Sequence, residues 1–233
     1  MRTPRPASGL RLLTPLSLLT AAIVISFAFQ PQWSTIPLML VLVGIGGGRS
    51  LFREENWQPA DDITTLRLGL FLIFTALVLD SVGFSWPAIA VGAAALILDA
   101  GDGYVARRTT PTSAGAGFDE SVDALIVLIL SVALIPVWGW WVILPGIFYY
   151  LFRAALFLRP AWRQQLPPSL RRKTIAASQG ILLLAAGSPV ALANPWFGFT
   201  CAVIALVSLV YSFGRDLLWL EQHAGIPTPA HAH

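Results

Sequence analysis

The chain is poor in charged residues. Asp, Glu, Lys and Arg make up 12% of its 233 residues, whereas about 25% is typical of a soluble globular domain. Apolar residues make up 56%, and the mean hydropathy is +0.70. This balance excludes an ordinary soluble domain and predicts an integral membrane protein whose backbone polar groups are satisfied internally. We expect membrane lipids, and no nucleic acid, among its partners.

Cysteine and strand-like patterns are also scarce. The single cysteine, Cys201, cannot form an internal disulfide. Leu, Ala, Ile and Val run continuously instead of alternating with polar residues, which favours helices over a barrel. About eight apolar segments are long enough, or nearly so, to cross ~30 Å of hydrocarbon. We predict an all-α, polytopic membrane helix bundle with about eight transmembrane helices, at 12–29, 35–51, 65–82, 86–105, 115–137, 138–158, 174–193 and 196–217.

Basic residues are missing from every loop on one expected side of the membrane. With the N-terminus inside, all fifteen Lys and Arg residues fall on the inner side or at inner helix ends. This distribution follows the positive-inside rule and predicts a multi-pass protein of the cell (plasma or inner) membrane. The first segment also resembles a signal peptide, since Arg residues precede its apolar run. Its removal would leave the topology of the rest unchanged.

Four aspartates are concentrated around one expected inner loop. Asp99 and Asp102 are three residues apart at the end of one segment, and Asp119 and Asp123 are four apart at the start of the next. Each spacing puts a pair on one helix face, and the short loop predicts antiparallel neighbours. Ionisable groups at membrane depth indicate function, and like charges need a counter-charge. Hard oxygen ligands suit Mg²⁺ or Mn²⁺, so we predict two divalent cations at this site, on the cytoplasmic side.

Small residues and arginines accompany the aspartates. Gly103, Ala106 and Gly115 thin the helix surfaces, so that a phosphorylated ligand can approach the backbone closely. Arg107 follows within one turn and suits bidentate contact with a phosphate. A purely structural alternative is ion pairing of the aspartates with Arg107 and Arg108. Two arginines cannot neutralise four buried carboxylates, which disfavours that alternative.

The pattern D-x2-D-G-x2-A-R-x7-G-x3-D-x3-D resembles the signature of the CDP-alcohol phosphatidyltransferase family. Its eight positions are Asp99, Asp102, Gly103, Ala106, Arg107, Gly115, Asp119 and Asp123. The stretch 61–67 is similar to the family's N-x-x-T-x-x-R element, with Thr64 and Arg67 matching and Asp61 in place of the Asn. The resemblance implies a six-helix catalytic core at 61–220. Residues 1–60 would add two spans, and 221–233 would form a disordered cytoplasmic tail.

The resemblance implies a two-metal transfer of a phosphatidyl group in phospholipid biosynthesis. A CDP-linked lipid such as CDP-diacylglycerol would be the donor, and an alcohol hydroxyl would displace CMP. Asp123 would act as general base, and homodimers would be the expected assembly. The implied metal ligands are Asp99, Asp102, Asp119 and Asp123. The implied CDP-binding residues are Thr64, Arg67, Gly103, Ala106, Arg107 and Gly115.

A second group of basic residues lies around the inner loop between the sixth and seventh segments. Its members are Arg153, Arg159, Arg163, Arg171, Arg172 and Lys173. Topology alone accounts for such a cluster, as does attraction to anionic lipids, worth ~1 kcal/mol per residue. The family resemblance adds a pocket for a phosphorylated acceptor, such as glycerol 3-phosphate or an inositol phosphate. We expect Arg153 and Lys173 to contact that phosphate.

Other functions must explain the same aspartates. An aromatic prenyltransferase-like enzyme also uses Asp-rich metal sites, but its two motifs lie far apart in sequence. A transporter would place acidic residues near the middle of the bilayer and show inverted repeats, and neither is visible. A non-catalytic lipid-binding protein remains a third alternative, because Asp61 departs from the family pattern.

Overall fold

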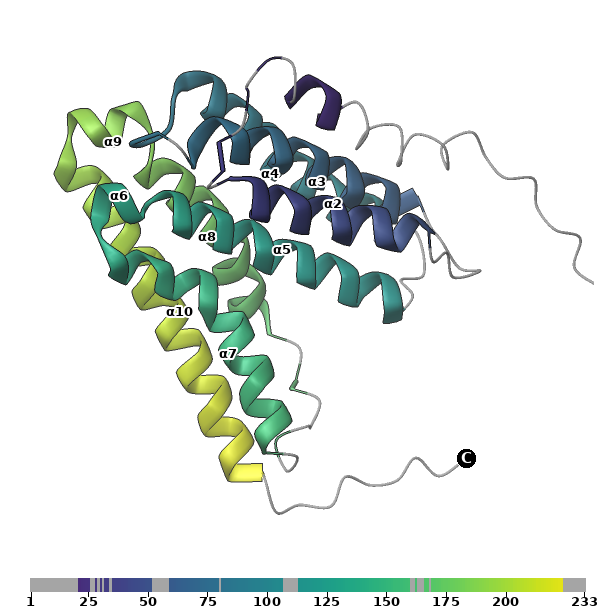
Figure 1. Cartoon of the computed structure of the whole chain (residues 1–233). Coiled ribbons are helices and arrows are strands. Elements are labelled where there is room, and N and C mark those ends of the chain that lie inside the picture. The colour runs from purple at the N-terminus through teal and green to yellow at the C-terminus, as the bar shows by residue number, and fades with distance from the viewer. Residues whose placement is uncertain are drawn as a thin grey trace, which may run out of the picture.

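The structure is a computed structural model (Figure 1). It describes residues 21–25, 28, 30, 32–33, 35–51, 59–79, 81–106, 113–159, 162, 166–167 and 169–223. Only the backbone is described at 46–51, 59–62, 100–106 and 113–119. The described part of the chain is helical and contains no strand. This confirms the all-α class predicted from the continuous apolar runs.

The long helices follow the predicted apolar segments from the second onward. They are α2 (Ile36–Leu51), α3 (Pro59–Val78), α4 (Trp86–Ala106), α5 (Ser113–Ala133), α7 (Leu144–Leu158), α8 (Leu170–Ala186) and α10 (Pro195–His223). Short helical turns connect them, namely α6 (Ile135–Trp138), η2 (Trp140–Ile143) and α9 (Pro189–Ala193). The first predicted segment and the C-terminal tail lie largely outside the described residues.

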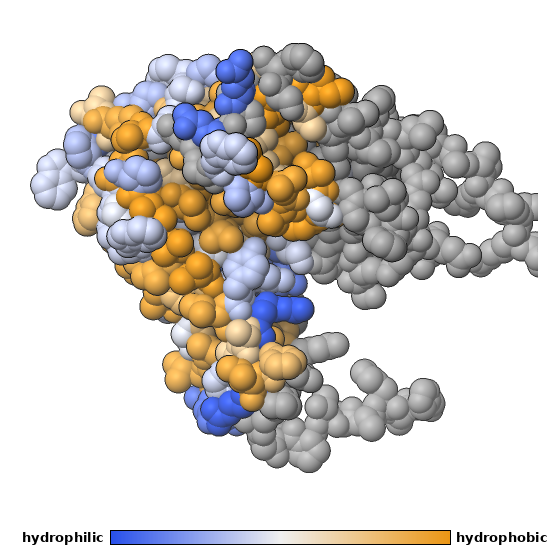
Figure 2. Space-filling view, in the orientation of Figure 1, coloured by the Kyte–Doolittle hydropathy of each residue, from blue (hydrophilic) through white to orange (hydrophobic). Residues whose placement is uncertain are grey.

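Two described helical stretches are long and apolar enough to cross a membrane, Trp140–Leu158 and Pro195–His223. Shorter apolar helices cover Ile36–Ile45, Ile63–Val78 and Trp86–Asp99. The number of eight spans therefore stays a prediction. The apolar helices and the hydrophobic surface in Figure 2 fit an integral membrane protein. Large apolar side chains are exposed on α7 and α10, among them Leu151, Phe157, Val207 and Leu218.

The seventh predicted segment is interrupted in the structure. A single helix was expected over 174–193, but α8 ends at Ala186 and α9 starts afresh at Pro189. Proline lacks the N–H of a helix interior and favours the first helical positions. The Ser188 hydroxyl caps α9 by accepting a hydrogen bond from the backbone N–H of Ala191 (3.2 Å). The sequence Ser188-Pro189 is therefore a start signal that overrides the continuous apolar pattern.

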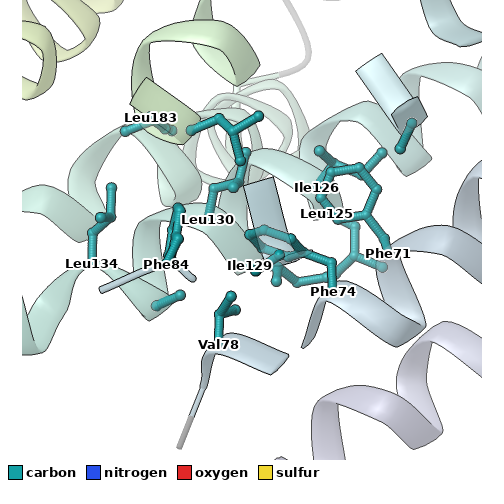
Figure 3. Packing of buried hydrophobic residues seen from close by; sticks show 14 of the residues in the cluster. Phe71, Phe74, Val78, Phe84, Leu125, Ile126, Ile129, Leu130, Leu134 and Leu183 are labelled. Carbon is teal, nitrogen blue, oxygen red and sulfur yellow. The ribbon is translucent and has the colours of Figure 1, made fainter. Parts of the chain in front are cut away.

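Helix α3 lies at the centre of the bundle and packs against α2, α4 and α5. Its buried side chains Phe71 and Phe74 meet the α5 residues Leu125 and Ile129, as Figure 3 shows. The ring centroids of Phe71 and Phe74 are 5.4 Å apart, a tilted geometry that aromatic pairs favour. A row of large apolar side chains thus fixes α3 against α5. The same row of side chains therefore also fixes Arg67, which lies one helical turn before Phe71.

Helices α7 and α10 run side by side and away from α2–α5 (Figure 1). Helix α7 joins the bundle through α5, and α10 joins it through α8. Gly146 marks a close approach of α7 to α5, since a Cβ there would lie 2.7 Å from the Cα of Leu128. The turns after α3 and α8 are joined by a hydrogen bond from the Phe84 N–H to the Gly187 carbonyl (2.8 Å).

Candidate functional site

A buried arginine joins two of the four aspartates. One terminal nitrogen of Arg67, on α3, lies 2.7 Å from Oδ1 of Asp99 on α4. The other lies 2.7 Å from Oδ1 of Asp123 on α5. The Arg67 side chain is 1% exposed, whereas those of Asp99 and Asp123 are 33% and 48% exposed. Three helices therefore converge on one charged cluster that solvent reaches from the carboxylate side.

The sequence of α3 explains why Arg67 is buried. Arg67 precedes Phe71 by four residues and Phe74 by seven, so all three lie on the face that packs into the bundle. Thr64 lies one turn before Arg67 and is also buried, as is Thr65. A guanidinium stays charged in proteins, and burying it is costly unless carboxylates compensate it. The packing of α3 thus requires acidic residues on α4 and α5 at this level.

The two acidic faces meet through α3. The short loop predicted α4 and α5 as direct neighbours, but within the described residues α4 packs chiefly on α3, whereas α5 packs on α7, α3 and α8. The reason lies in α3 itself, whose bulky apolar face fills the space between its neighbours at the level of the core. Arg67 lies one turn before that apolar face, and its positive guanidinium contacts both aspartates.

The remaining signature residues are described by their backbone or fall outside the described residues. Asp102, Gly103 and Ala106 lie in the last turns of α4, and Gly115 and Asp119 lie in the first turns of α5. Arg107 is outside the described residues. Among the described side chains, no group of three His, Cys, Asp or Glu residues forms a metal site. The side chains of Asp102 and Asp119 do not belong to that described set.

The available donors nevertheless fit a hard cation. Asp99 and Asp123 supply carboxylate oxygens, the ligand type that Mg²⁺ and Mn²⁺ favour. The α4 backbone continues as helix through residue 102, and the α5 backbone is already helical at residue 119. Positions 102 and 119 are each about one helical turn from residues 99 and 123, so the backbone places each pair of positions on nearly the same helix face.

The second basic cluster holds helices together. Arg171 on α8 lies 2.8 Å from Asp216 on α10, and it also donates to the Ser212 carbonyl (3.2 Å). Arg159 lies 2.8 Å from Glu221 at the end of α10. Sequence reasoning missed both acidic partners, although they lie near the C-terminal end of an apolar helix opposite several arginines. Their position was the available signal, because carboxylates there need a basic partner.

Arg153 and Lys173 behave differently from these arginines. Both side chains are exposed, and neither forms an ion pair with a described carboxylate. Arg172 lies 3.9 Å from Asp216 and also donates to the Pro167 carbonyl. Arg163 lies outside the described residues. Of the described basic side chains in the predicted acceptor region, Arg153 and Lys173 are therefore the ones whose charge no described carboxylate offsets.

Comparison with known families agrees with this picture. The family model described as CDP-alcohol phosphatidyltransferase matches residues 57–213, which is more than half of the chain. The matched stretch starts just before α3 and ends within α10, so it contains Arg67, Asp99 and Asp123. No protein with curated annotation and no solved structure matches the chain significantly. The match confirms the resemblance inferred from the spacing of the signature residues.

Proposed function

Because this chain belongs to the CDP-alcohol phosphatidyltransferase family, we propose that it transfers a phosphatidyl group from a CDP-linked lipid to an alcohol. CDP-diacylglycerol is the proposed donor, and CMP is the proposed leaving product. The observation that carries the proposal is the convergence of Arg67, Asp99 and Asp123 from three helices inside the matched region. Exposed apolar side chains next to this cluster in the chain, such as Leu66 and Ile97, suit a substrate that is half lipid and half nucleotide.

The proposed metal ligands are the four carboxylates Asp99, Asp102, Asp119 and Asp123. Members of this family use divalent metal ions, and two Mg²⁺ or Mn²⁺ ions are proposed for this site. When bound, such ions neutralise phosphate charge and stabilise the attacking and leaving oxygens. The two described carboxylates are partly exposed, which supports access of an ion from solvent.

Asp123 is the proposed general base. It accepts the proton of the acceptor hydroxyl while that oxygen forms a bond to the lipid-bearing phosphorus. The bond from this phosphorus to the CMP oxygen breaks, and CMP leaves. The 48% exposure of the Asp123 side chain supports the approach of a water-soluble acceptor. The proposed contacts to the CDP moiety are Thr64, Arg67, Gly103, Ala106, Arg107 and Gly115.

The proposed acceptor is a phosphorylated polyol, such as glycerol 3-phosphate or an inositol phosphate. Arg153 and Lys173 support this proposal because they are exposed and carry charge that no described carboxylate offsets. Arg159 and Arg171, in contrast, already have carboxylate partners on α10. A phosphate is a suitable partner for exposed basic groups whose charge no described carboxylate offsets.

We further propose that the site faces the cytoplasm from the cell membrane and that the protein forms homodimers. The concentration of Lys and Arg on one side of the expected spans supports this orientation. The proposed division of the chain is an N-terminal extension at 1–60, a catalytic core at 61–220 and a tail at 221–233. The family match at 57–213 supports a core of this extent.

The test is CMP release by the purified full chain with CDP-diacylglycerol, Mg²⁺ or Mn²⁺, and a panel of acceptor alcohols. We expect metal-dependent release with a phosphorylated acceptor and its loss in Asp123→Asn. The matched control is Glu120→Gln, which removes one charge from the exposed face of the same helix and keeps activity. Activity of Asp123→Asn close to wild type refutes the general-base role. Absence of release with every acceptor, together with retained CDP binding, favours a lipid-binding protein without turnover.

A further inference from the structure

Arg67 lies on α3, outside the aspartate signature, and contacts two of the signature's aspartates. Its guanidinium lies 2.7 Å from a carboxylate oxygen of Asp99 and 2.7 Å from one of Asp123. We propose that Arg67 is a resident counter-cation, which assembles the two carboxylates before a divalent ion binds and competes with that ion for them. The inference rests on the proposed function, because it takes Asp99 and Asp123 to be metal ligands.

The assembling role follows from charge and geometry. Two carboxylates on different helices repel each other when they approach, so α4 and α5 need a positive group between them. The planar guanidinium presents donors in a fixed fork, and here one terminal nitrogen serves each aspartate. Contacts of this length are strong charge-assisted hydrogen bonds. Arg67 is anchored by the packing of α3, so it sets the distance between the carboxylates.

The competing role follows from the fixed charge of Arg67. Arginine cannot lose its proton in proteins, so an ion that binds Asp99 and Asp123 meets a positive charge already in place. The ion either binds beside the guanidinium or displaces it, and both routes weaken its binding. A carboxylate has several acceptor sites, so contact with one nitrogen does not exhaust either aspartate. Arg67 thus lowers the affinity of the two aspartates for the ion. It also keeps them in place when no ion is bound.

This role is distinct from a contact with CDP. A CDP-binding arginine changes nucleotide affinity and leaves the binding of metal in the absence of nucleotide unaltered. A counter-cation changes metal binding when neither donor nor acceptor is present. Measurements with metal alone therefore separate the two roles. They also separate a counter-cation from a residue that only holds helices together, because removing a purely structural residue does not tighten ion binding.

The experiment measures Mn²⁺ binding and thermal unfolding of the purified full chain without substrates. Free Mn²⁺ is followed by electron paramagnetic resonance, and Tm is measured with and without Mn²⁺. The variants are Arg67→Gln, which removes the charge, and Arg67→Lys, which keeps it. The matched control is Arg171→Gln, because Arg171 also bridges helices through a carboxylate at 2.8 Å but lies in the other cluster.

Without metal, we expect Arg67→Gln to have a lower Tm than wild type. Mn²⁺ should raise the Tm of this variant by more than it raises that of wild type. The variant should also bind Mn²⁺ about tenfold more tightly. Arg67→Lys keeps an affinity near that of wild type. Arg171→Gln also melts earlier, but its gain from Mn²⁺ equals that of wild type. If Arg67→Gln cannot be purified without metal, the proposal requires Mn²⁺ to restore it, and failure to do so overturns the proposal.

Other outcomes separate the inference from the proposed function. Wild-type protein that binds Mn²⁺, with equal or weaker binding by Arg67→Gln, overturns the counter-cation role and leaves the metal site standing. Wild-type protein that does not bind Mn²⁺ overturns the metal site and the inference together. Tighter binding in Arg171→Gln as well shows a general charge effect and also overturns the specific role of Arg67.

Discussion

Replacing Gly146 by alanine tests how closely α5 and α7 pack. A Cβ at this position would lie 2.7 Å from the Cα of Leu128, 3.0 Å from its Cδ1 and 3.1 Å from the Cβ of Ser131. The nearest atom belongs to the backbone of α5, so a side-chain rotation cannot relieve the contact. The two helices must separate by several tenths of an ångström over their whole interface. Alanine therefore forces a shift of α7, which carries Arg153.

The size of the effect follows from two opposing contributions. Overpacking a close helix contact costs typically about 1–3 kcal/mol. Alanine is preferred over glycine inside a helix by up to ~1 kcal/mol, and less in the first turn, where Gly146 lies. We therefore expect Gly146→Ala to lower the free energy of unfolding by about 1–2 kcal/mol. Gly214→Ala is the matched control, since a Cβ there meets nothing within 4 Å.

The assay is unfolding of the purified protein in detergent, followed by circular dichroism during denaturant titration. Gly214 lies inside α10, so its replacement should raise stability by up to ~1 kcal/mol through helix propensity. The two alanine variants should consequently shift the unfolding midpoint in opposite directions. Equal stabilisation of both variants would refute the close approach of α7 to α5 and the reasoning built on it.

Three further predictions concern the core, the ion pair between α8 and α10, and the acceptor. In the same unfolding assay, Phe74→Ala should lower the free energy of unfolding by about 3–5 kcal/mol, because it leaves a cavity between α3 and α5. Asp216→Asn should lower the free energy of unfolding by about 1–3 kcal/mol, because Arg171 loses its ionised partner across the α8–α10 interface. Restored stability in the double variant with Arg171→Gln would support that cause. Combined replacement of Arg153 and Lys173 by glutamine should raise the KM for a phosphorylated acceptor at least about tenfold and leave the KM for CDP-diacylglycerol unchanged. An unchanged acceptor KM in steady-state CMP release argues against that phosphate site.

Helix type and location were predictable because the apolar runs are long and bounded by polar loops. The predicted segment 86–105 corresponds closely to α4, and the predicted boundary at 137–138 lies beside Gly139, whose φ of +88° ends α6. Local signals in the sequence suffice for such features. The break after α8 was missed because the apolar pattern continues through it, although Ser188 and Pro189 carry the start signal for α9.

The candidate site was predictable in its composition and less so in its arrangement. Spacing places Asp99 and Asp123 on defined helix faces, but it does not tell which helix lies between them. The bridge through Arg67 depends on the packing of α3 against both neighbours, which is a tertiary property. The partners Asp216 and Glu221 were missed for the same reason, since ion pairs between distant segments leave no local spacing pattern.

The hydrogen bond between Phe84 and Gly187 fixes one end of the bundle. It ties the turn after α3 to the turn after α8, and the side chain of Leu192 fills the space beside Gly83 in the same region. Asp99 lies roughly 20 Å along α4 from this turn, so a tilt of about 3° displaces it by about 1 Å. Catalytic groups must be held within about 0.5 Å. A small tilt of α4 about this turn is therefore magnified at Asp99, and the contact of Asp99 with Arg67 opposes such a tilt at the other end of the helix.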